Sequence, residues 1–224
     1  MFHQSFSANH QGRDFAIGDL HGMYDLLFEA LDKVDFDFAK DRCFSVGDLI
    51  DRGARSEQCL GLINEPWFHP VCGNHEDTLR MVARCLASSA ITADWILNGG
   101  RWHLMVPTEK LHYYADLVDT LPELISVTTP SGKLIALCHA EYPLPYWAPD
   151  DIEKDSELRN YMMWSREKVR SGDTSTVSGV DAIICGHTIV ESPQQLGNSF
   201  YIDTGAFQSN ILTLVNLENL QVVT

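Results

Sequence analysis

The sequence predicts an α/β fold in which two sheets pack together and helices cover them. Three observations predict this class: strands, glycine-rich turns and helices repeat in the first half, strands dominate the second half, and the composition is globular. The 224 residues are 45% hydrophobic and 21% charged, which suits one well-buried core and is short for two. Because no repeat, low-complexity tract or linker interrupts the chain, residues 1–224 are expected to form a single domain.

The first third of the chain alternates short apolar runs with amphipathic segments. The apolar runs predict strands at Asp14–Ile17, Arg42–Val46 and Phe68–Cys72. Helices are predicted at Met23–Val34, near Ser56–Ile63, and from the turn after the third strand to about Ala87. Strand, turn and helix in this repeated order imply a parallel sheet with right-handed crossovers.

The rest of the chain changes from helices to strands. Residues Ile91–Leu121 are predicted to be mostly helical, with a break at Asn98-Gly99-Gly100. Leu124–Thr128 and Lys133–Cys138 flank a turn sequence and predict a hairpin. Further strands are expected at Ala182–Cys185, Phe200–Ile202, Ile211–Asn216 and Leu220–Val223.

Charge and hydropathy exclude several classes of partner. The net charge of −15 argues against a protein that binds nucleic-acid phosphates, since such binding needs a basic surface. No apolar run has the length of a signal peptide or of a membrane helix, so no membrane partner is expected and the cytoplasm is the predicted location. The six cysteines form no C-x-x-C pair and are expected to be reduced thiols.

Residue types that can bind metals or phosphate follow each of the first three predicted strands. The motifs are Gly18-Asp19-Leu20-His21-Gly22, Gly47-Asp48-Leu49-Ile50-Asp51-Arg52-Gly53 and Gly73-Asn74-His75-Glu76. Two later histidines, His139 and His187, also end apolar runs. Each motif alone could be a turn or a helix cap, and each histidine alone is better explained as structural. In this order, and all at strand ends, they indicate a metal centre.

The spacing of these residues suits two ions. Asp19 and His21 are two positions apart, so in extended backbone both side chains point to one side and can reach one ion. Asp48 ends the second strand, and its two oxygens could bridge two ions. Asn74 ends the third strand and adds a neutral oxygen. Mixed oxygen and nitrogen ligands suit manganese, iron or zinc better than magnesium or calcium.

The motifs resemble those of the phosphoprotein phosphatase (PPP) branch of the calcineurin-like metallophosphoesterases. Further segments carry the resemblance along nearly the whole chain: Trp67-Phe68-His69-Pro70-Val71-Cys72, Trp95-Ile96-Leu97-Asn98-Gly99-Gly100, Cys138-His139-Ala140-Glu141-Tyr142-Pro143, Trp164-Ser165-Arg166-Glu167, Gly186-His187-Thr188 and Tyr201-Ile202-Asp203-Thr204-Gly205-Ala206. These segments resemble the branch that includes bacteriophage lambda protein phosphatase and bacterial serine/threonine protein phosphatases. This resemblance implies a four-layer αββα sandwich of two mixed sheets flanked by helices.

The resemblance also implies a role for each site residue. One divalent ion would be held by Asp19, His21 and Asp48, and the other by Asp48, Asn74, His139 and His187. Manganese is the favoured metal, with iron or zinc as alternatives. His75 would be the catalytic acid with Asp51 as its paired carboxylate, and Arg52 and Arg166 would bind the phosphate.

The implied function is a metal-dependent protein serine/threonine phosphatase that hydrolyses phosphomonoesters by direct attack of a metal-bridging hydroxide. Its partners would be phosphorylated proteins or peptides, and activity on phosphotyrosine stays open. Because Ala140-Glu141 follows His139 where eukaryotic enzymes have two glycines, no regulatory subunit is implied. Cys72 also stands where relatives often carry arginine, which removes one cationic contact.

Two other functions remain as alternatives. Symmetrical bis(5'-nucleosyl)-tetraphosphate hydrolases resemble the chain in the same motifs. A catalytically inactive binding module should lack at least one ligand or the acid, and here every expected position is filled.

Overall fold

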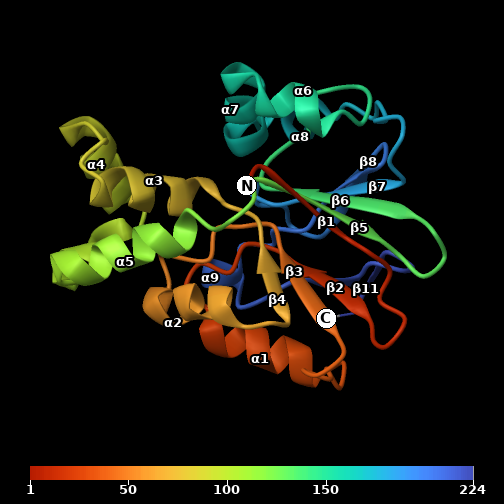
Figure 1. The fold of residues 1–224 in the computed structure, drawn as a ribbon, viewed down its shortest axis with the longest axis horizontal. Coiled ribbons are helices and arrows are strands. Elements are labelled where there is room, and N and C mark those ends of the chain that lie inside the picture. Colours follow the sequence, from red (N-terminus) through yellow and green to blue (C-terminus); the bar gives the residue numbers. More distant parts are fainter. Residues whose placement is uncertain (224) are drawn as a thin grey trace.

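Two mixed sheets pack face to face in the computed structural model, which describes residues 1–223. One sheet has five strands in the order β11-β10-β2-β3-β4, and the other has six in the order β1-β5-β6-β7-β9-β8. Figure 1 shows α1 and α2 below the first sheet and α6, α7 and α8 above the second. The predicted α/β class and the αββα layering are confirmed.

The strands are short and most of the helices have fewer than three turns. The strands are β1 (His3–Phe6), β2 (Asp14–Ile17), β3 (Arg42–Ser45), β4 (Phe68–Pro70), β5 (Leu124–Thr128), β6 (Leu134–Cys138), β7 (Ala182–Cys185), β8 (Gln194–Leu196), β9 (Ser199–Tyr201), β10 (Leu214–Asn216) and β11 (Gln221–Val222). The α-helices are α1 (Tyr24–Asp32), α2 (Ser56–Gly61), α3 (Asn74–Ala83), α4 (Ser89–Leu97), α5 (Thr108–Val118), α6 (Pro149–Glu153), α7 (Ser156–Trp164), α8 (Glu167–Ser171) and α9 (Ala206–Ser209). Two 3₁₀ helices, η1 (Leu62–Asn64) and η2 (Gly100–Met105), follow α2 and α4.

The central strands are buried on both faces, as their apolar sequences require. In β2, Phe15 and Ile17 face the helices of the outer layer, whereas Ala16 between them faces the other sheet. The strands β2, β3 and β4 are parallel, as the repeated strand-turn-helix order predicts. β10 returns antiparallel to β2, so the sheet is mixed.

Three apolar cores hold the four layers together. The first lies between the two sheets, the second between the five-stranded sheet and α1, α2, α3 and α5, and the third between the six-stranded sheet and α6 and α7. Residues of the inner core include Ala16, Phe44, Val71, Ile125, Leu137 and Ile184, all at most 1% exposed. The layers therefore bury each sheet on both faces, which fixes the strand ends that carry the polar motifs.

Several elements differ from the sequence-based prediction. The edge strands β1 and β8 and the short helices α6–α8 were not predicted, since their sequences lack a clear apolar period. β4 ends at Pro70, which has no N–H for the sheet. Asn74 does not end this strand; it is the first residue of α3, after Gly73 as N-cap. Within residues 1–223, no helix is both long and apolar enough to cross a membrane.

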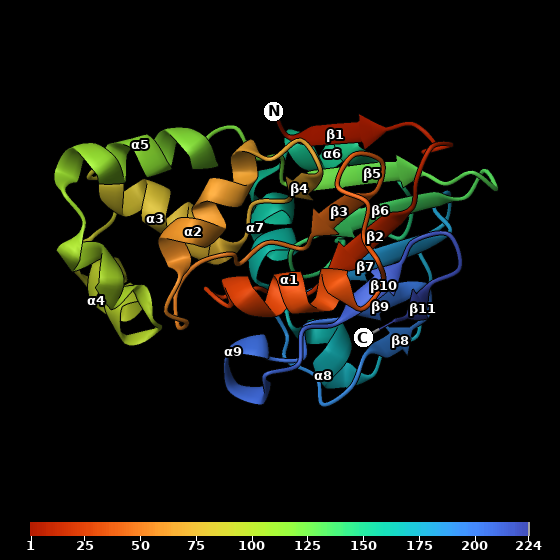
Figure 2. The ribbon, with the colours of Figure 1, turned by 90° about the horizontal axis from the view of Figure 1, so that it is seen from below.

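Figure 2 shows α3, α4 and α5 gathered to one side of the sheets. The chain reverses between α4 and η2 at Gly99, whose φ of +111° favours glycine. This turn places α4 and η2 against the loop that follows β3. The contact is seen at Arg52, whose N–H points to the carbonyl of Gly99 at 3.5 Å.

Candidate metal centre

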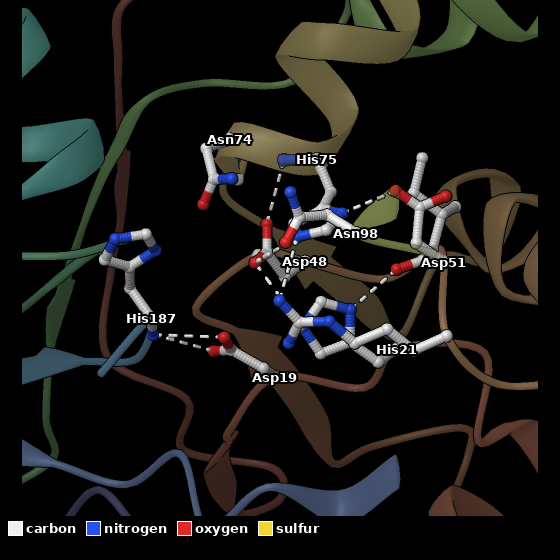
Figure 3. A network of polar contacts seen from close by, with 12 residues as sticks. Asp19, His21, Asp48, Asp51, Asn74, His75, Asn98 and His187 are labelled. Atoms are coloured by element: carbon white, nitrogen blue, oxygen red, sulfur yellow. Dashed lines mark hydrogen bonds and ion pairs between the residues drawn. The ribbon is translucent and has the colours of Figure 1, made fainter. Parts of the chain in front are cut away.

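Loops from both sheets meet at one end of the strands and bring the predicted ligands together (Figure 3). Asp19 and His21 follow β2, and Asp48 follows β3. From the other sheet, His139 follows β6 and His187 follows β7. Since the carboxyl ends of parallel strands share one edge, residues far apart in the sequence become neighbours.

Two groups of donor atoms share Asp48. The atoms of His21, Asp48 and His75 form one group, and those of Asp48, His139 and His187 form the other, with all atoms in each group within 4.8 Å of one another. Asp48 Oδ2 lies 3.6 Å from His21 Nε2, and Asp48 Oδ1 lies 3.4 Å from His139 Nε2. Each carboxylate oxygen therefore faces a different group, which is the arrangement that a bridging ligand needs.

Backbone carbonyls fix which ring nitrogen is available in two histidines. His21 Nδ1 lies 2.7 Å from the carbonyl of Ile50, and His139 Nδ1 lies 2.7 Å from the carbonyl of Val46. Because a carbonyl only accepts, each Nδ1 carries a proton, and Nε2 is left to face the site. This second contact is the one that commonly orients metal-binding histidines.

Asn74 and Asp19 join the same network. Asn74 Oδ1 lies 2.8 Å from His139 Nε2, so this ring nitrogen faces two oxygens, the amide of Asn74 and the carboxylate of Asp48. Both carboxylate oxygens of Asp19 accept from the backbone N–H of His187, at 3.1 and 3.0 Å. Gly186 permits this approach, since a Cβ there would lie 2.0 Å from Asp19 Oδ1.

The buried charges are unbalanced in favour of a cation. Burial and the charges of Asp203 and Asp48 raise the pKa of Asp19 well above its usual value. Burial alone would also raise the pKa of Asp48, but the imidazoles of His139 and His75 hold that pKa well below its usual value. Asp203, which lies beside Asp19, leaves its buried Oδ2 without a hydrogen-bond partner among the described residues. Divalent cations would neutralise these carboxylates.

The protonation states of His21 and His187 also favour metal binding. Burial lowers the pKa of His21 to about 3, and burial and His139 lower the pKa of His187 to about 3. Both rings are therefore neutral near pH 7, and neutral imidazole is the form that binds metals. The shared carboxylate and the neutral rings of His21 and His187 fit a site for two divalent ions.

His75 and Asp51 form a buried pair beside these donors. His75 Nδ1 lies 2.5 Å from Asp51 Oδ2, and Asp51 is fully buried. Burial alone would lower the pKa of His75, but the charges of Asp48 and Asp51 outweigh it and raise that pKa. The ring thus has a fixed orientation, with Nε2 toward the cavity, 3.8 Å from Asp48 Oδ2.

Two arginines reach the same cavity, which has a volume of about 550 Å³. Arg52 points its guanidinium at the Nε2 atoms of His21 and His75, at 2.6 and 3.3 Å, and also lies over the Phe207 ring. Arg166 donates to the carbonyl of His187 at 2.6 Å. Two guanidinium groups beside the donor atoms offer a site for a phosphate group.

The backbone at the site is strained. Among residues 1–223, nine non-glycine residues have positive φ, and five of them are predicted site residues: His21, Asp48, Asp51, Arg52 and His187. Each such residue costs about 1–3 kcal/mol, and this strain concentrates at functional sites. Contacts described above join the ten predicted site residues into one network, and five of the ten lie on strained backbone.

Glu76 is a buried site residue that the sequence analysis missed. Its carboxylate accepts from the backbone N–H groups of Asp48, Leu49 and Gly73 at 2.8, 2.8 and 3.0 Å, and from Ile50 at 3.2 Å. Burial and the charge of Asp48 raise its pKa to about 7. Its position three residues after Gly73 is that of a capping-box glutamate, which is the signal that could have found it.

The fold and the site are those of a metal-dependent hydrolase. The family model for "Calcineurin-like phosphoesterase" matches residues 15–191. The chain is 34% identical over 214 residues to a serine/threonine-protein phosphatase 2 of Salmonella typhimurium. The aligned residues cover 91% of this chain and 92% of that protein. The chain therefore belongs to the calcineurin-like phosphoesterase family.

Two further similarities are more restricted. A symmetrical bis(5'-nucleosyl)-tetraphosphatase of Dechloromonas aromatica is 46% identical over 71 residues, which are 31% of this chain and 26% of that protein. A solved structure provisionally assigned as a diadenosine tetraphosphatase superposes with a TM-score of 0.70 at 19% identity, over 98% of this chain and 96% of that one. At this identity, the second similarity concerns the fold alone.

Proposed function

We propose that this chain is a single-domain, dinuclear protein phosphatase that hydrolyses phosphoserine and phosphothreonine esters in proteins or peptides. The observation that carries the proposal is a pair of buried donor groups that share Asp48, beside a cavity lined by His75, Arg52 and Arg166. The similarity to a bacterial serine/threonine phosphatase over 91% of the chain supports the protein substrate.

We assign the six ligands to two divalent ions that share Asp48. Asp19 and His21 complete one set, and Asn74, His139 and His187 complete the other. When bound, such ions activate a water for attack on phosphorus and offset the charge that builds up on the phosphate. Manganese is the proposed metal, because oxygen and imidazole donors of this mixture suit it.

His75 is proposed to protonate the departing serine or threonine oxygen. Its Nε2 faces the cavity while its Nδ1 is held by Asp51, so the ring can deliver a proton from Nε2 without rotating. Asp51 stabilises the charged ring before transfer. General acid catalysis of this kind contributes about 10²–10⁴-fold to the rate.

Arg52 and Arg166 are proposed to bind the phosphoryl oxygens. Each guanidinium can donate to two oxygens at once, and both line the cavity that contains Asp48 and His75. In the structure, the Arg52 guanidinium lies against the Nε2 atoms of His21 and His75, and a bound phosphate would compete for it. These fixed positive charges stabilise the negative charge of the transition state.

A substrate panel tests the proposal. Purified protein would be assayed with Mn²⁺, with Zn²⁺ and with a chelator, on a phosphoserine peptide, a phosphotyrosine peptide and diadenosine tetraphosphate. We expect metal-dependent release of phosphate from the phosphoserine peptide. Dominant release of ADP from diadenosine tetraphosphate would instead support a symmetrical tetraphosphatase.

That second function is supported by one observation. The 71-residue match to the Dechloromonas aromatica tetraphosphatase has 46% identity, which is higher than the identity to the serine/threonine phosphatase. The match covers 31% of this chain, whereas the match to the protein phosphatase covers 91%. The protein phosphatase is therefore the leading proposal.

A further inference from the structure

The Asp51 carboxylate is held by side-chain N–H groups, and two of these belong to tryptophans. Trp95 Nε1 donates to Asp51 Oδ2 at 2.5 Å, and Trp102 Nε1 donates to Asp51 Oδ1 at 2.6 Å. Together with His75 Nδ1 on Oδ2, three N–H groups point at one fully buried carboxylate. Both oxygens are therefore occupied, and the plane of the carboxylate is fixed.

The two tryptophans are themselves held in place. Trp95 is buried in α4 and stacks on the His103 ring, with centroids 4.3 Å apart and planes 16° apart. Gly100 leaves room for the indole, since a Cβ there would lie 2.5 Å from the ring. Trp102 lies on η2, directly after the Gly99 turn that contacts Arg52. The α4–η2 segment thus delivers both indoles to Asp51 as one unit.

Indole is chemically suited to this task. Its N–H only donates, it does not titrate, and it has no second polar atom to attract water. A donor of this kind can fix a carboxylate through charge-assisted hydrogen bonds without competing for the proton that Asp51 shares with His75. A serine, histidine or lysine at the same place would add an acceptor or a titrating group.

We propose that Trp95 and Trp102 are positioning residues of the phosphatase reaction, whose N–H groups hold Asp51 in the orientation that keeps His75 Nε2 directed at the leaving group. This proposal rests on the function proposed above. The two tryptophans act through Asp51 and His75 and do not touch the reacting atoms. They belong to the machinery that donates the proton, so their effect depends on how much the leaving group needs one.

The first test compares two substrates with Trp95→Phe and Trp102→Phe in the Mn²⁺-loaded enzyme. Phenylalanine keeps an aromatic ring and removes the N–H. We expect kcat to fall by about 10- to 100-fold on a phosphoserine peptide, which is less than the loss expected when the general acid itself is removed. On 2,4-dinitrophenyl phosphate, whose leaving group needs no proton, the loss should stay under about 3-fold. The control is Trp147→Phe. The Trp147 ring stacks on Tyr142, and its substitution should change neither rate.

A double-mutant cycle shows whether the effect passes through Asp51. In an Asp51→Asn background, Trp95→Phe should cause no further loss on the phosphoserine peptide, because the acceptor is already altered. An equal loss on both substrates, or a full additional loss in the Asp51→Asn background, would overturn the proposal.

The second test needs no tryptophan variant. The chain has five tryptophans, so the Zn²⁺-loaded protein should give five indole N–H resonances in an NMR spectrum. We expect two of them to move in Asp51→Asn, while those of Trp67, Trp147 and Trp164 stay in place. If the wild type is an active phosphatase but no indole resonance moves in Asp51→Asn, only the role of the two tryptophans is overturned. If the wild type hydrolyses no phosphomonoester with any cation, the proposed function is overturned as well.

Discussion

The chemistry of single residues at this site depends on what each ring nitrogen faces. His21 Nε2 and His139 Nε2 face carboxylate or amide oxygens, because backbone carbonyls already occupy their Nδ1 atoms. His75 differs, since its Nδ1 faces Asp51 and its Nε2 faces the cavity. One residue type therefore serves two purposes here, and the partner of Nδ1 separates them.

Substitution of His75 tests the proposed acid. His75→Asn should retain both cations, because the assigned ligands are intact, but should lose about 10²–10⁴-fold in turnover on a phosphoserine peptide. Turnover and metal content, measured by mass spectrometry on the same sample, check this. A normal rate with normal metal content would contradict the role of His75.

The pH dependence of stability tests the state of His187. Its pKa is lowered to about 3 by burial and His139, while an unfolded histidine has a pKa of 6.5. Below pH 6.5 the unfolded chain therefore binds a proton that the folded chain does not, and stability falls as the pH drops toward 3. Between pH 7 and pH 5 this amounts to about 2 kcal/mol.

The measurement is the free energy of unfolding in urea for metal-free protein. Wild type should lose about 2 kcal/mol more than His187→Gln between pH 7 and pH 5, because the variant lacks this titration. Parallel curves for the two proteins would show that His187 is not held neutral by its surroundings.

Single-residue patterns selected residues that the fold brings close together, but not the contacts that support them. The proposed ligand residues could be selected from the sequence because each carries its chemistry in its own motif. Glu76, Trp95 and Trp102 could not be placed, since their roles depend on where the loop after β3 lies against α3 and α4. Asp203 was missed for the same reason: its neighbour Asp19 is far away in the sequence.

At the scale of elements, α3 begins at the site because Glu76 anchors it. The Glu76 carboxylate accepts from Gly73 at the start of α3 and from three successive N–H groups in the loop after β3. It therefore joins the segment that carries Asp48 to the helix that carries His75. Without this acceptor, four buried backbone N–H groups would compete for partners.

Substitution of Glu76 should destabilise the fold. Glu76→Gln places an amide N–H₂ group against backbone donors, so about two N–H groups lose their acceptor and stability should fall by about 2–5 kcal/mol. Urea unfolding of the metal-free protein measures this. Glu57→Gln is the matched control: its half-exposed carboxylate pairs with Lys110, and we expect a change within about 1 kcal/mol. Equal effects of the two substitutions would contradict the anchoring role.

The strands that were predicted correctly are those whose own sequences are mostly apolar. The inner strands β2, β3, β5, β6 and β7 are apolar on both faces and appear close to their predicted bounds. The edge strands β1 and β8 were missed because they are partly exposed and owe their structure to a neighbouring strand. The sequence of an edge strand need not be apolar on both sides.

At the scale of the whole molecule, the site joins the two sheets. Asp19, His21 and Asp48 come from the five-stranded sheet, whereas His139 and His187 come from the six-stranded sheet. Cations bound by both sets would hold the sheets together at this edge. The net charge of −15 also makes neutralisation of the buried carboxylates favourable.

Cations should therefore stabilise the whole fold. For a cation at 100 times its Kd, the free energy of unfolding should rise by about 2.7 kcal/mol per site, and the melting temperature should rise with Mn²⁺ concentration. Asp48→Asn should weaken both sites and flatten this response. Asp94→Asn, an exposed carboxylate on the same cavity, should respond like wild type. A full response in Asp48→Asn would argue against a shared carboxylate.

The most direct measurement of the central claim is anomalous X-ray scattering from crystals grown with Mn²⁺. We expect two anomalous peaks about 3.5–4 Å apart, one on each side of the Asp48 carboxylate. A single peak, or peaks that do not contact Asp48, would contradict it.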